Sequence, residues 1–328
     1  MAETGEKEMR RPAIGYQFEA LELPVATQPG VDLFVDTVRG ATGGKGLSWA
    51  NPLSTVEGAF DRLDSPRFFS AEFLKNATIH IIGDVREQFD APDGLYGVKL
   101  VGAANGRPRH STSGGAVVDG NGVSWRESAT AENRSLLRIE GQGYEFHNIL
   151  FVPEPGYAAV RLYRTATDSV DASHAKFKTC RFSGGGSQVG IGIEDYGGQS
   201  HVEVSADCEF DNLEYGIYQS NAGIDWANRW LIADNFFRGN KNDIVLNSKM
   251  ARILRNVFGT VYHATTHPKT VDMVGTADGS VANYVLDNYF ADAAAAVLIS
   301  KGYIPATGDI WRNYVADTAA QIVTVPTA

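Results

Sequence analysis

A short phrase recurs through the second half of the sequence and restricts the fold more than any other feature. The phrase is an Asn or Cys, one intervening residue and then a large apolar residue. Its seven copies, given by their first and last residues, are Asn148/Leu150, Cys180/Phe182, Cys208/Phe210, Asn235/Phe237, Asn256/Phe258, Asn288/Phe290 and Asn313/Val315. Successive copies start 21 to 32 residues apart. Repetition at such a period is typical of a solenoid, in which stacked repeats share one interior.

Three strand-like runs accompany the phrase. The first precedes the Asn or Cys, and the second contains the large apolar residue. The third opens seven residues later, as Ile217 does after Phe210, Ile244 after Phe237 and Ile322 after Val315. Short strands separated by Gly, Asn and Asp turns cannot each bury a face alone. We therefore expect a parallel β-solenoid in which each strand pairs with the strand one repeat away.

Shorter turns of the same coil are expected upstream, beginning with a helix. Apolar runs recur about every 20 residues at Thr78–Ile82, Val98–Val101, Ala116–Val118 and Leu136–Ile139. Before them, Ser54-Thr55-Val56-Glu57 has the form of a capping box. The residues that follow place Val56, Ala59, Phe60 and Leu63 on one helical stripe. An amphipathic helix at this point would cover the open end of the solenoid, where core side chains are otherwise exposed.

The sequence divides into an arm and one domain. Residues 1–30 show no periodicity and contain Pro12, Pro24 and Pro29, so we interpret them as an extended arm. Residues 31–328 form the β-helix domain, with its first strand and capping helix at 31–64.

Composition excludes several classes of protein. Hydrophobic residues make up 43% of the chain, too many for a disordered protein, and two cysteines cannot form a disulfide framework. The 29 basic and 39 acidic residues give a net charge of −10, which argues against nucleic acid as a partner. The first twelve residues are charged and lack the apolar stretch of a signal peptide. No apolar run is long enough for membrane insertion, so we expect a protein made in the cytoplasm.

Residues Leu33–Leu63 resemble the first segment of right-handed parallel β-helix proteins of the pectate-lyase-like kind. The matching features are Val35-Asp36 at the end of a strand, the Gly-rich loop Gly40–Gly46, Gly46-Leu47-Ser48, and Pro52-Leu53-Ser54-Thr55 before the helix. The runs Ala77–Val85 and Val98–Ala103 also resemble the first coils of that family. Together with the repeated phrase, the resemblance covers about residues 31–325. It implies an all-β fold, a right-handed parallel β-helix.

The resemblance leaves three functions open, because the family includes polysaccharide lyases, hydrolases, epimerases and phage tailspikes. A member without a signal peptide and with a short arm most resembles the phage virion proteins. That likeness implies a virion spike that attaches to other virion proteins through residues 1–30 and binds host surface polysaccharide. The alternatives are a polysaccharide depolymerase, either lyase or glycoside hydrolase, and a purely structural decoration protein.

The same likeness implies a homotrimer, since tailspikes of this kind pack their β-helices lengthwise. The sequence adds two reasons. The run Ala319–Val325 is apolar and β-branched, and exposed strands of that composition favour pairing with another chain. Val245 and Leu298 also align at positions that we expect to face outward, which would leave an apolar row along the side of the solenoid.

Carboxylates are the residues that could carry enzymatic chemistry. Glycosidases need two carboxyl groups separated by about 5 to 9.5 Å, and neighbouring coils of a β-helix can supply them. Aligning the third strands places Arg161 beside Gly192 and Tyr218, and Tyr163 beside Glu194 and Ser220. Glu194 and Asp195 are therefore the candidate catalytic residues. A second outward acidic set is Asp207, Glu209 and Asp211. The alternative interpretation of both sets is solvated surface charge on an acidic protein.

Aromatic residues are concentrated in the same coils. The candidate carbohydrate-binding residues are Tyr163, Arg164, Tyr196, Tyr218 and Trp226. Flat rings pack well against the apolar faces of sugars. The alternative is that several of these rings belong to the core or to contacts between protomers.

Other motifs predict no metal site and no cofactor. His263 and His267 are four residues apart, but the segment ends in Pro268 and has no helical pattern to place both rings on one face. The loop Gly40–Ser48 lacks the spacing of a phosphate-binding loop, so we interpret it as a turn. Cys180 and Cys208 occupy equivalent places in successive repeats. We expect them to form a buried thiol stack that continues the Asn row.

Overall fold

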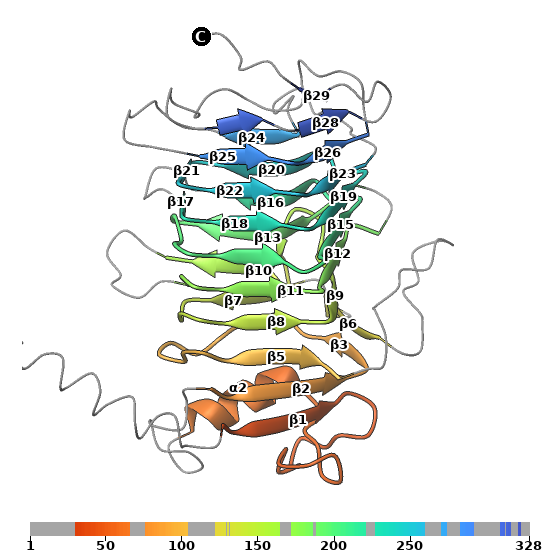
Figure 1. Cartoon of the computed structure of the whole chain (residues 1–328). Coiled ribbons are helices and arrows are strands. Elements are labelled where there is room, and N and C mark those ends of the chain that lie inside the picture. Colours follow the sequence, from red (N-terminus) through yellow and green to blue (C-terminus); the bar gives the residue numbers. More distant parts are fainter. Residues whose placement is uncertain are drawn as a thin grey trace, which may run out of the picture.

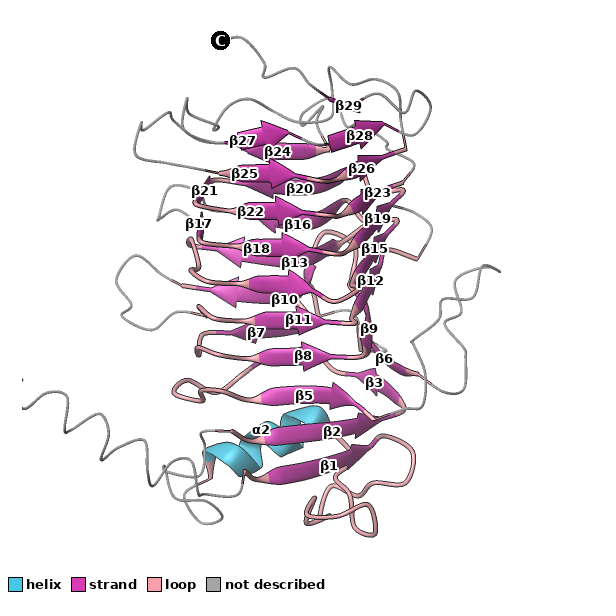
Figure 2. Cartoon of the chain, in the orientation of Figure 1, coloured by secondary structure: helices cyan, strands magenta, loops and turns pink. Residues whose placement is uncertain are grey.

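The strand-like runs form three parallel sheets that wind around one interior (Figures 1 and 2). The computed structural model describes residues 30–65, 76–103, 122–128, 130, 132–164, 172–185, 188–220, 227–259, 270–273, 283–291, 309–311, 313–315 and 321–322. Apart from β29, each described strand pairs in parallel with the equivalent strand of a neighbouring coil, as β10 does with β7 on one side and β13 on the other. The right-handed parallel β-helix predicted from the sequence is therefore the fold of the chain.

Sheets A and C form opposite walls of the coil, and sheet B forms its narrow side (Figure 2). In the described part of the chain, sheet A consists of β1 (Asp32–Asp36), β2 (Thr78–Ile82), β5 (Lys99–Gly102), β8 (Glu145–His147), β11 (Lys176–Lys178), β14 (Glu203–Ser205), β18 (Leu231–Ala233), β22 (Arg252–Leu254), β25 (Tyr284–Leu286) and β27 (Asp309–Trp311). Sheet B consists, over the same residues, of β3 (Asp84–Arg86), β6 (Val123–Arg126), β9 (Ile149–Val152), β12 (Arg181–Ser183), β15 (Glu209–Asp211), β19 (Phe236–Arg238), β23 (Val257–Phe258), β26 (Tyr289–Phe290), β28 (Asn313–Val315) and β29 (Gln321–Ile322).

The remaining strands complete each coil. Sheet C consists, among the described residues, of β4 (Phe89–Asp90), β7 (Leu137–Ile139), β10 (Ala158–Tyr163), β13 (Ile191–Tyr196), β16 (Tyr215–Gln219), β20 (Asn242–Leu246) and β24 (Val271–Met273). A small sheet D pairs β17 (Ala227–Asn228) with β21 (Ser248–Lys249) at the turn that leads into sheet A. None of the helical residues described has the length and apolarity that a membrane span needs.

Helix α2 (Val56–Asp64) lies at the N-terminal end of the coil (Figure 1). Its predicted stripe is buried, and Phe60 packs on Tyr144 and Phe89 of the interior. The predicted capping box was wrong by one residue, because the N-cap is Thr55, whose hydroxyl accepts from the Gly58 N–H. The remaining N–H groups of the first turn, at Val56 and Glu57, donate to the carboxylate of Glu87. A distant side chain thus completes the cap, so the helix is attached to the first coil.

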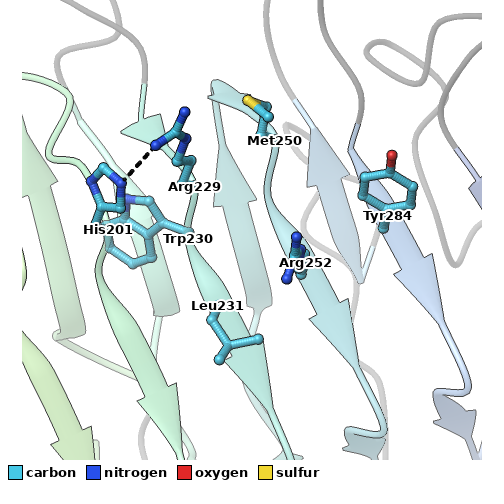
Figure 3. Close-up of a pocket in the computed structure, with 7 residues that line it drawn as sticks. All are labelled: His201, Arg229, Trp230, Leu231, Met250, Arg252 and Tyr284. Carbon is cyan, nitrogen blue, oxygen red and sulfur yellow. Dashed lines mark hydrogen bonds between the residues drawn. The ribbon is translucent and has the colours of Figure 1, made fainter. Parts of the chain in front are cut away.

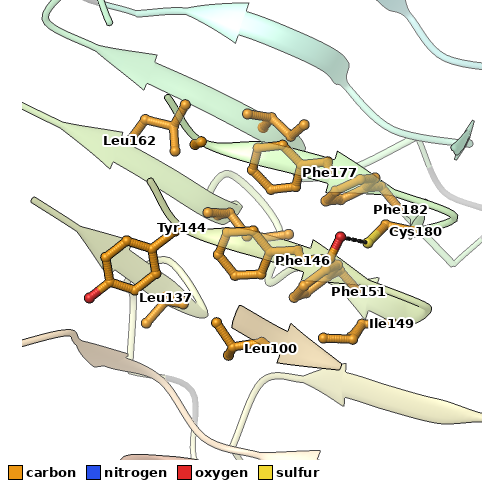
Figure 4. Close-up of a cluster of buried hydrophobic side chains, with 14 of the residues drawn as sticks. Leu100, Leu137, Tyr144, Phe146, Ile149, Phe151, Leu162, Phe177, Cys180 and Phe182 are labelled. Carbon is orange, nitrogen blue, oxygen red and sulfur yellow. Dashed lines mark hydrogen bonds between the residues drawn. The ribbon is translucent and has the colours of Figure 1, made fainter. Parts of the chain in front are cut away.

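The interior is built from aligned rows of large side chains (Figure 4). Stacked rings with centroids 4.7 to 5.1 Å apart run along sheet B through Phe151, Phe182, Phe210, Phe237, Phe258 and Phe290. This spacing equals the distance between neighbouring strands, so one ring per coil fills the interior without gaps.

Asparagines form a second row, at the turn from sheet A to sheet B. Asn256 Oδ1 accepts from both the backbone N–H and the Nδ2 of Asn235, each at 3.0 Å. The same contacts join Asn288 to Asn256 and Asn313 to Asn288. The predicted Asn row is confirmed over these four coils.

Three sequence predictions were wrong in detail. At the first copy of the phrase, register places Ile149 and Phe151 in the two rows, one residue after the predicted Asn148 and Leu150. Strand β29, which holds Ile322, pairs antiparallel with β28 and does not form another coil. Val245 is only 1% exposed, so it does not contribute to an outer apolar row. The expected arm at 1–30, apart from residue 30, and Leu298 lie outside the described residues.

The Gly40–Ser48 loop is a turn packed against its own chain, as predicted. The Gly40 N–H donates to Asp36 O, and the Gly46 N–H donates to Asn51 O. A Cβ at Gly44 would lie 2.1 Å from the carbonyl oxygen of Pro52, so a side chain at this position would clash with the backbone.

Candidate functional site

The outer face of sheet C brings together most of the predicted site residues. Alternate residues of β7, β10, β13 and β16 point away from the core there and form aligned rows. We call this surface the sheet C patch, which consists of Arg138, Arg161, Tyr163, Glu194, Tyr196 and Tyr218. Four of these six residues were candidates from the sequence.

The register within the patch differs from the predicted alignment. Arg161 lies beside Glu194, which in turn lies beside Tyr218. Tyr163 lies beside Tyr196. The predicted neighbours Gly192 and Glu194 were therefore each placed two residues too early on β13. The reason is the turn before this strand, which is longer than its counterparts.

Arg138, Tyr163 and Tyr196 form a stack, and Arg161 lies beside its two rings. The rings of Tyr163 and Tyr196 are 5.0 Å apart and nearly parallel. The guanidinium of Arg138 lies 4.3 Å from the centre of the Tyr163 ring, and that of Arg161 lies 4.6 Å from the centre of Tyr196. Contacts of this kind are attractive because the ring faces carry negative potential. Arg161 also lies 5.9 Å from the centre of the Tyr163 ring, so its guanidinium sits beside the edges of both rings and does not cover the outer face of Tyr196.

Glu194 is held by an ion pair beside the stack. Its Oε2 lies 3.0 Å from Arg161 Nε, and its Oε1 accepts from Arg161 Nη2 at 3.2 Å. The side chain is only 8% exposed. One hydrogen bond and a second close contact between the charged groups fix the orientation of both side chains. Glu194 therefore positions Arg161 beside Tyr196.

Tyr218 extends the patch by one coil. Its ring stacks on Tyr215 with centroids 4.1 Å apart. Burial, with the nearby carboxylates of Glu194 and Glu214, raises the pKa of Tyr218 above its ordinary value of 10.0. The phenol thus stays protonated and can donate a hydrogen bond at any physiological pH.

Asp195 points into the structure, away from the patch. Its Oδ1 accepts from the backbone N–H groups of Gly198 and Gln199, each at 3.0 Å, and the residue is fully buried. A carboxylate with this environment stabilises the turn after β13. Arg164 follows β10, where its backbone N–H donates to Tyr196 O at 2.9 Å. Trp226 lies outside the described residues.

The second acidic set is split between exposed and covered positions. Asp207 is exposed, whereas Asp211 is almost buried and accepts hydrogen bonds from Arg181 and from Ser183. Asp211 does face outward from β15, on the opposite side to Phe210, but Arg181 and Ser183 cover it and it is not a solvated charge. These residues form a structural ion pair on sheet B.

The buried cysteines carry no reactive site. Both are free, and burial raises the pKa of the Cys208 thiol. Among the described residues, no group of three or more His, Cys, Asp or Glu is placed to hold a metal ion. His263 and His267 lie outside those residues.

Sequence reasoning missed Arg138, which covers Tyr163 from the preceding coil. It also missed a groove on sheet A lined by Arg229, Arg252 and Tyr284. The residues of the patch and of the groove come from different coils, so no local sequence motif marks either site. The signal that could have found them is the alignment of the repeats themselves, with the correct turn lengths.

Comparisons with known proteins identify no relative by sequence. No protein-family model matches the chain, and no curated protein matches it. Among solved structures, the pectate lyase Pel9A gives a TM-score of 0.45 at 11% identity, covering 91% of this chain and 83% of that one. The Streptococcus pneumoniae surface protein and adhesin PfbA gives a TM-score of 0.37 at 10% identity, covering 79% of this chain and 84% of that one.

The Dettilon tailspike protein gives a TM-score of 0.29 at 11% identity, covering 86% of this chain and 68% of that one. These likenesses carry no argument about activity. The strand register and the stacked interior identify the chain by its fold, which is that of a right-handed parallel β-helix protein.

Proposed function

We propose that the protein binds a polysaccharide along the outer face of sheet C. The observation that supports this most strongly is the Arg138–Tyr163–Tyr196 stack with Arg161 beside it. It holds phenol hydroxyls and guanidinium N–H groups in a row across successive coils. Coils repeat about every 4.8 Å, so the row offers regularly spaced donors to an extended chain of sugars.

The stack is suited to binding because its parts are already fixed. The Glu194 ion pair holds Arg161, and each ring is held by its neighbour. Rigid partners lose little conformational freedom when a ligand binds. Since Tyr163 has Tyr196 on one side and Arg138 on the other, we expect sugar hydroxyl groups to be recognised by the tyrosine hydroxyls, with less stacking on the rings than the sequence suggested.

Binding to purified bacterial capsular polysaccharide or lipopolysaccharide tests this proposal. Tyr163→Phe with Tyr196→Phe preserves the ring stack and removes both hydroxyls. We expect about a tenfold loss of affinity, since each hydrogen bond contributes about 0.5–1.5 kcal/mol. Tyr289→Phe with Tyr314→Phe, two exposed tyrosines on sheet B, is the matched control. Unchanged binding by the sheet C variant and by the corresponding double Ala variant would overturn the proposal.

A depolymerase is the second candidate function, and the site favours it less. Asp195 is engaged with backbone N–H groups, and both oxygens of Glu194 face Arg161. These two residues therefore do not present the pair of accessible carboxyls that glycoside hydrolysis requires. Incubating polysaccharide with the protein and measuring chain length separates the two functions. Shortened chains that disappear with Glu194→Gln would support the enzyme.

The biological setting is a further part of the proposal. A spike on a phage virion, made in the host cytoplasm and attached to other virion proteins through residues 1–30, fits the resemblance described from the sequence. Outward residues of sheet B, including the exposed Val257, Tyr289 and Tyr314, supply an apolar row for a homotrimer. Light scattering on protein lacking residues 1–30 tests the trimer, and a particle-binding assay with the same variant tests attachment.

A further inference from the structure

A groove of about 460 Å³ lies on sheet A, on the wall opposite the sheet C patch (Figure 3). It crosses four coils at the point where the chain enters β14, β18, β22 and β25. We call it the sheet A groove, and its main lining residues are His201, Arg229, Leu231, Met250, Arg252 and Tyr284. Leu231, Arg252 and Tyr284 are register partners, each the first residue of its strand. They therefore form one row along the groove.

The two arginines of the groove differ from most others in the protein. Among the described residues outside the groove, a carboxylate lies within 4 Å of Arg39, Arg86, Arg126, Arg134, Arg138, Arg161, Arg181, Arg238 and Arg255. Within the described residues, neither Arg229 nor Arg252 has such a partner. Acidic residues outnumber basic ones by 39 to 29, so carboxylates are plentiful and this absence is unusual.

Acidic neighbours of the row are directed elsewhere or lie farther along it. Glu203 is the register partner of Leu231, but its Oε1 accepts from Ser205 at 2.7 Å and lies 3.8 Å from Lys178 Nζ. Asp309 is the register partner of Tyr284, which places it two coils from Arg252 and three from Leu231. The centre of the groove thus carries two guanidinium charges without a compensating anion among the residues described.

A stacked pair of histidines closes one end. The rings of His174 and His201 are 4.7 Å apart and nearly parallel. Arg229 Nη1 donates to His201 Nε2 at 3.1 Å, which requires that nitrogen to be unprotonated. Burial lowers the pKa of His201, and the neighbouring His174 and Arg229 lower it further. The neutral imidazole of His201 therefore accepts a hydrogen bond from Arg229 and orients it, without neutralising the charge of the guanidinium.

We infer that the sheet A groove binds an acidic sugar residue of a glycan. Its anionic group, a carboxylate or a sulfate or phosphate ester, would lie between Arg229 and Arg252. Guanidinium groups match the planar geometry of such anions and bind them with two parallel hydrogen bonds. Leu231, Met250 and Tyr284 supply apolar surface beside the charges, which suits a sugar ring better than a small inorganic ion. The site lies on a different sheet from the proposed polysaccharide site, so each can be correct without the other.

Binding of defined probes to the full-length protein tests the inference. The probes are an oligogalacturonate, a chondroitin sulfate oligosaccharide, neutral dextran oligosaccharides and inorganic phosphate, measured by calorimetry at low salt. We expect one or both acidic oligosaccharides to bind, and Arg229→Gln with Arg252→Gln to weaken that binding at least tenfold. Chondroitin sulfate carries a carboxylate as well as a sulfate ester, so tighter binding than to the oligogalacturonate would indicate the sulfate, and equal or weaker binding the carboxylate.

Two control variants make the result specific. Arg86→Gln removes an exposed charge on sheet B and should leave binding unchanged. Tyr163→Phe with Tyr196→Phe is measured in parallel, because the sheet C patch is itself a proposed glycan site. Loss of binding in the Arg variant assigns the acidic probe to this groove, and loss in the Tyr variant alone would place it on sheet C and overturn the inference. The inference is overturned if neither acidic oligosaccharide binds, if dextran binds equally, if inorganic phosphate binds as tightly as the oligosaccharides, or if the double Arg variant has no effect. A thermal melt of that variant confirms that it is folded.

Discussion

The turn from sheet A to sheet B is built from thiols in the middle coils and from amides in the later ones. Cys180 and Cys208 occupy the position that Asn235, Asn256, Asn288 and Asn313 fill farther along the chain. Both kinds of side chain are buried, and both donate to the same row of backbone carbonyls. Cys180 Sγ and Cys208 Sγ donate to Phe146 O and Phe177 O, as Asn235 Nδ2 donates to Val204 O (Figure 4 shows the Cys180 contact).

The two chemistries differ in what they offer the previous coil. Asn256 Oδ1 is a strong acceptor that receives two N–H groups of Asn235. A thiol sulfur is only a weak acceptor. Amide coils are therefore linked to each other through side chains, whereas thiol coils are linked mainly by their backbones and by the Phe row. From Cys180 onward the described coils thus have a short buried donor at this turn, with an acceptor side chain only where the amides connect, whereas Ile149 fills the same place one coil earlier with an apolar side chain.

The largest effect should come from the Phe row, which is common to both regions. Phe237→Ala in the amide region and Phe182→Ala in the thiol region each remove a fully buried ring. We expect each to lower the free energy of unfolding by about 3–5 kcal/mol through lost burial and a cavity. Equal losses in urea melts would confirm that the interior is uniform. A much smaller loss for Phe237 would contradict the assigned row.

The next prediction concerns a buried carboxyl, Asp243. It has one described polar partner, whereas each amide of the Asn row has several. Asp243 is 4% exposed and accepts from Asn240 Nδ2 at 2.7 Å. Burial raises its pKa from 3.8 to about 7. The folded protein therefore keeps a proton that the unfolded chain releases from about pH 4 upward. Its contribution to stability is fully present below that pH and is lost as the pH rises through about 7.

Asp243→Asn should remove this pH dependence while keeping an acceptor for Asn240. We expect the variant to be more stable than the wild type at pH 8, by at most about 4 kcal/mol, and the difference to shrink toward pH 4. Thermal melts between pH 4 and 8 measure it, with Asp234→Asn as an exposed control. A constant difference across this range would contradict the raised pKa.

The amide and thiol regions can be compared directly by truncation. Asn256→Ala leaves the N–H groups of Asn235 and the carbonyl of Ile232 without their partners. Since an unsatisfied buried group costs about 1–3 kcal/mol, we expect a loss of about 2–4 kcal/mol. Cys208→Ala removes one weak donor and should cost less. Urea melts of the two variants rank them, and equal losses would show that the amide links contribute little.

The sequence predicted the repeat, the three strands per coil, the capping helix and the buried row. These features depend on which residues are apolar and how often they recur, which is visible in one chain. Register was harder, because turn lengths vary. From the Phe to the aligned interior residue of sheet C there are 9 residues in the coil of Phe151 and Val160 but 11 in that of Phe182 and Ile193. That difference shifted Glu194 in the prediction by two positions.

The candidate site was predicted in its members but not in its geometry. Tyr163, Tyr196, Tyr218 and Glu194 do share one face. Asp195, the next residue along β13, faces inward, because successive residues of a strand point to opposite sides. The groove arginines could not be predicted from the sequence. They are distinguished by having no described carboxylate within 4 Å, and the residues that neighbour them across coils are known only once the register is known.

The smallest expected effect is the most direct test of the contrast in the turn. Cys208→Asn would place an amide next to Asn235, with its Nδ2 near Phe177 O and its Oδ1 near the N–H of Cys180. An Asn side chain is only slightly larger than Cys, and the neighbouring coil already accepts an Asn in this position. We expect the free energy of unfolding to change by no more than about 1 kcal/mol, and to rise if the new link to Cys180 forms. Cys208→Leu, which fills the space without a hydrogen bond, is the matched control and should be the less stable of the two. Urea melts compare them. A loss for Cys208→Asn as large as that for Asn256→Ala would mean that the thiol coils are closed to amides by packing, so that the two regions differ in shape as well as in chemistry.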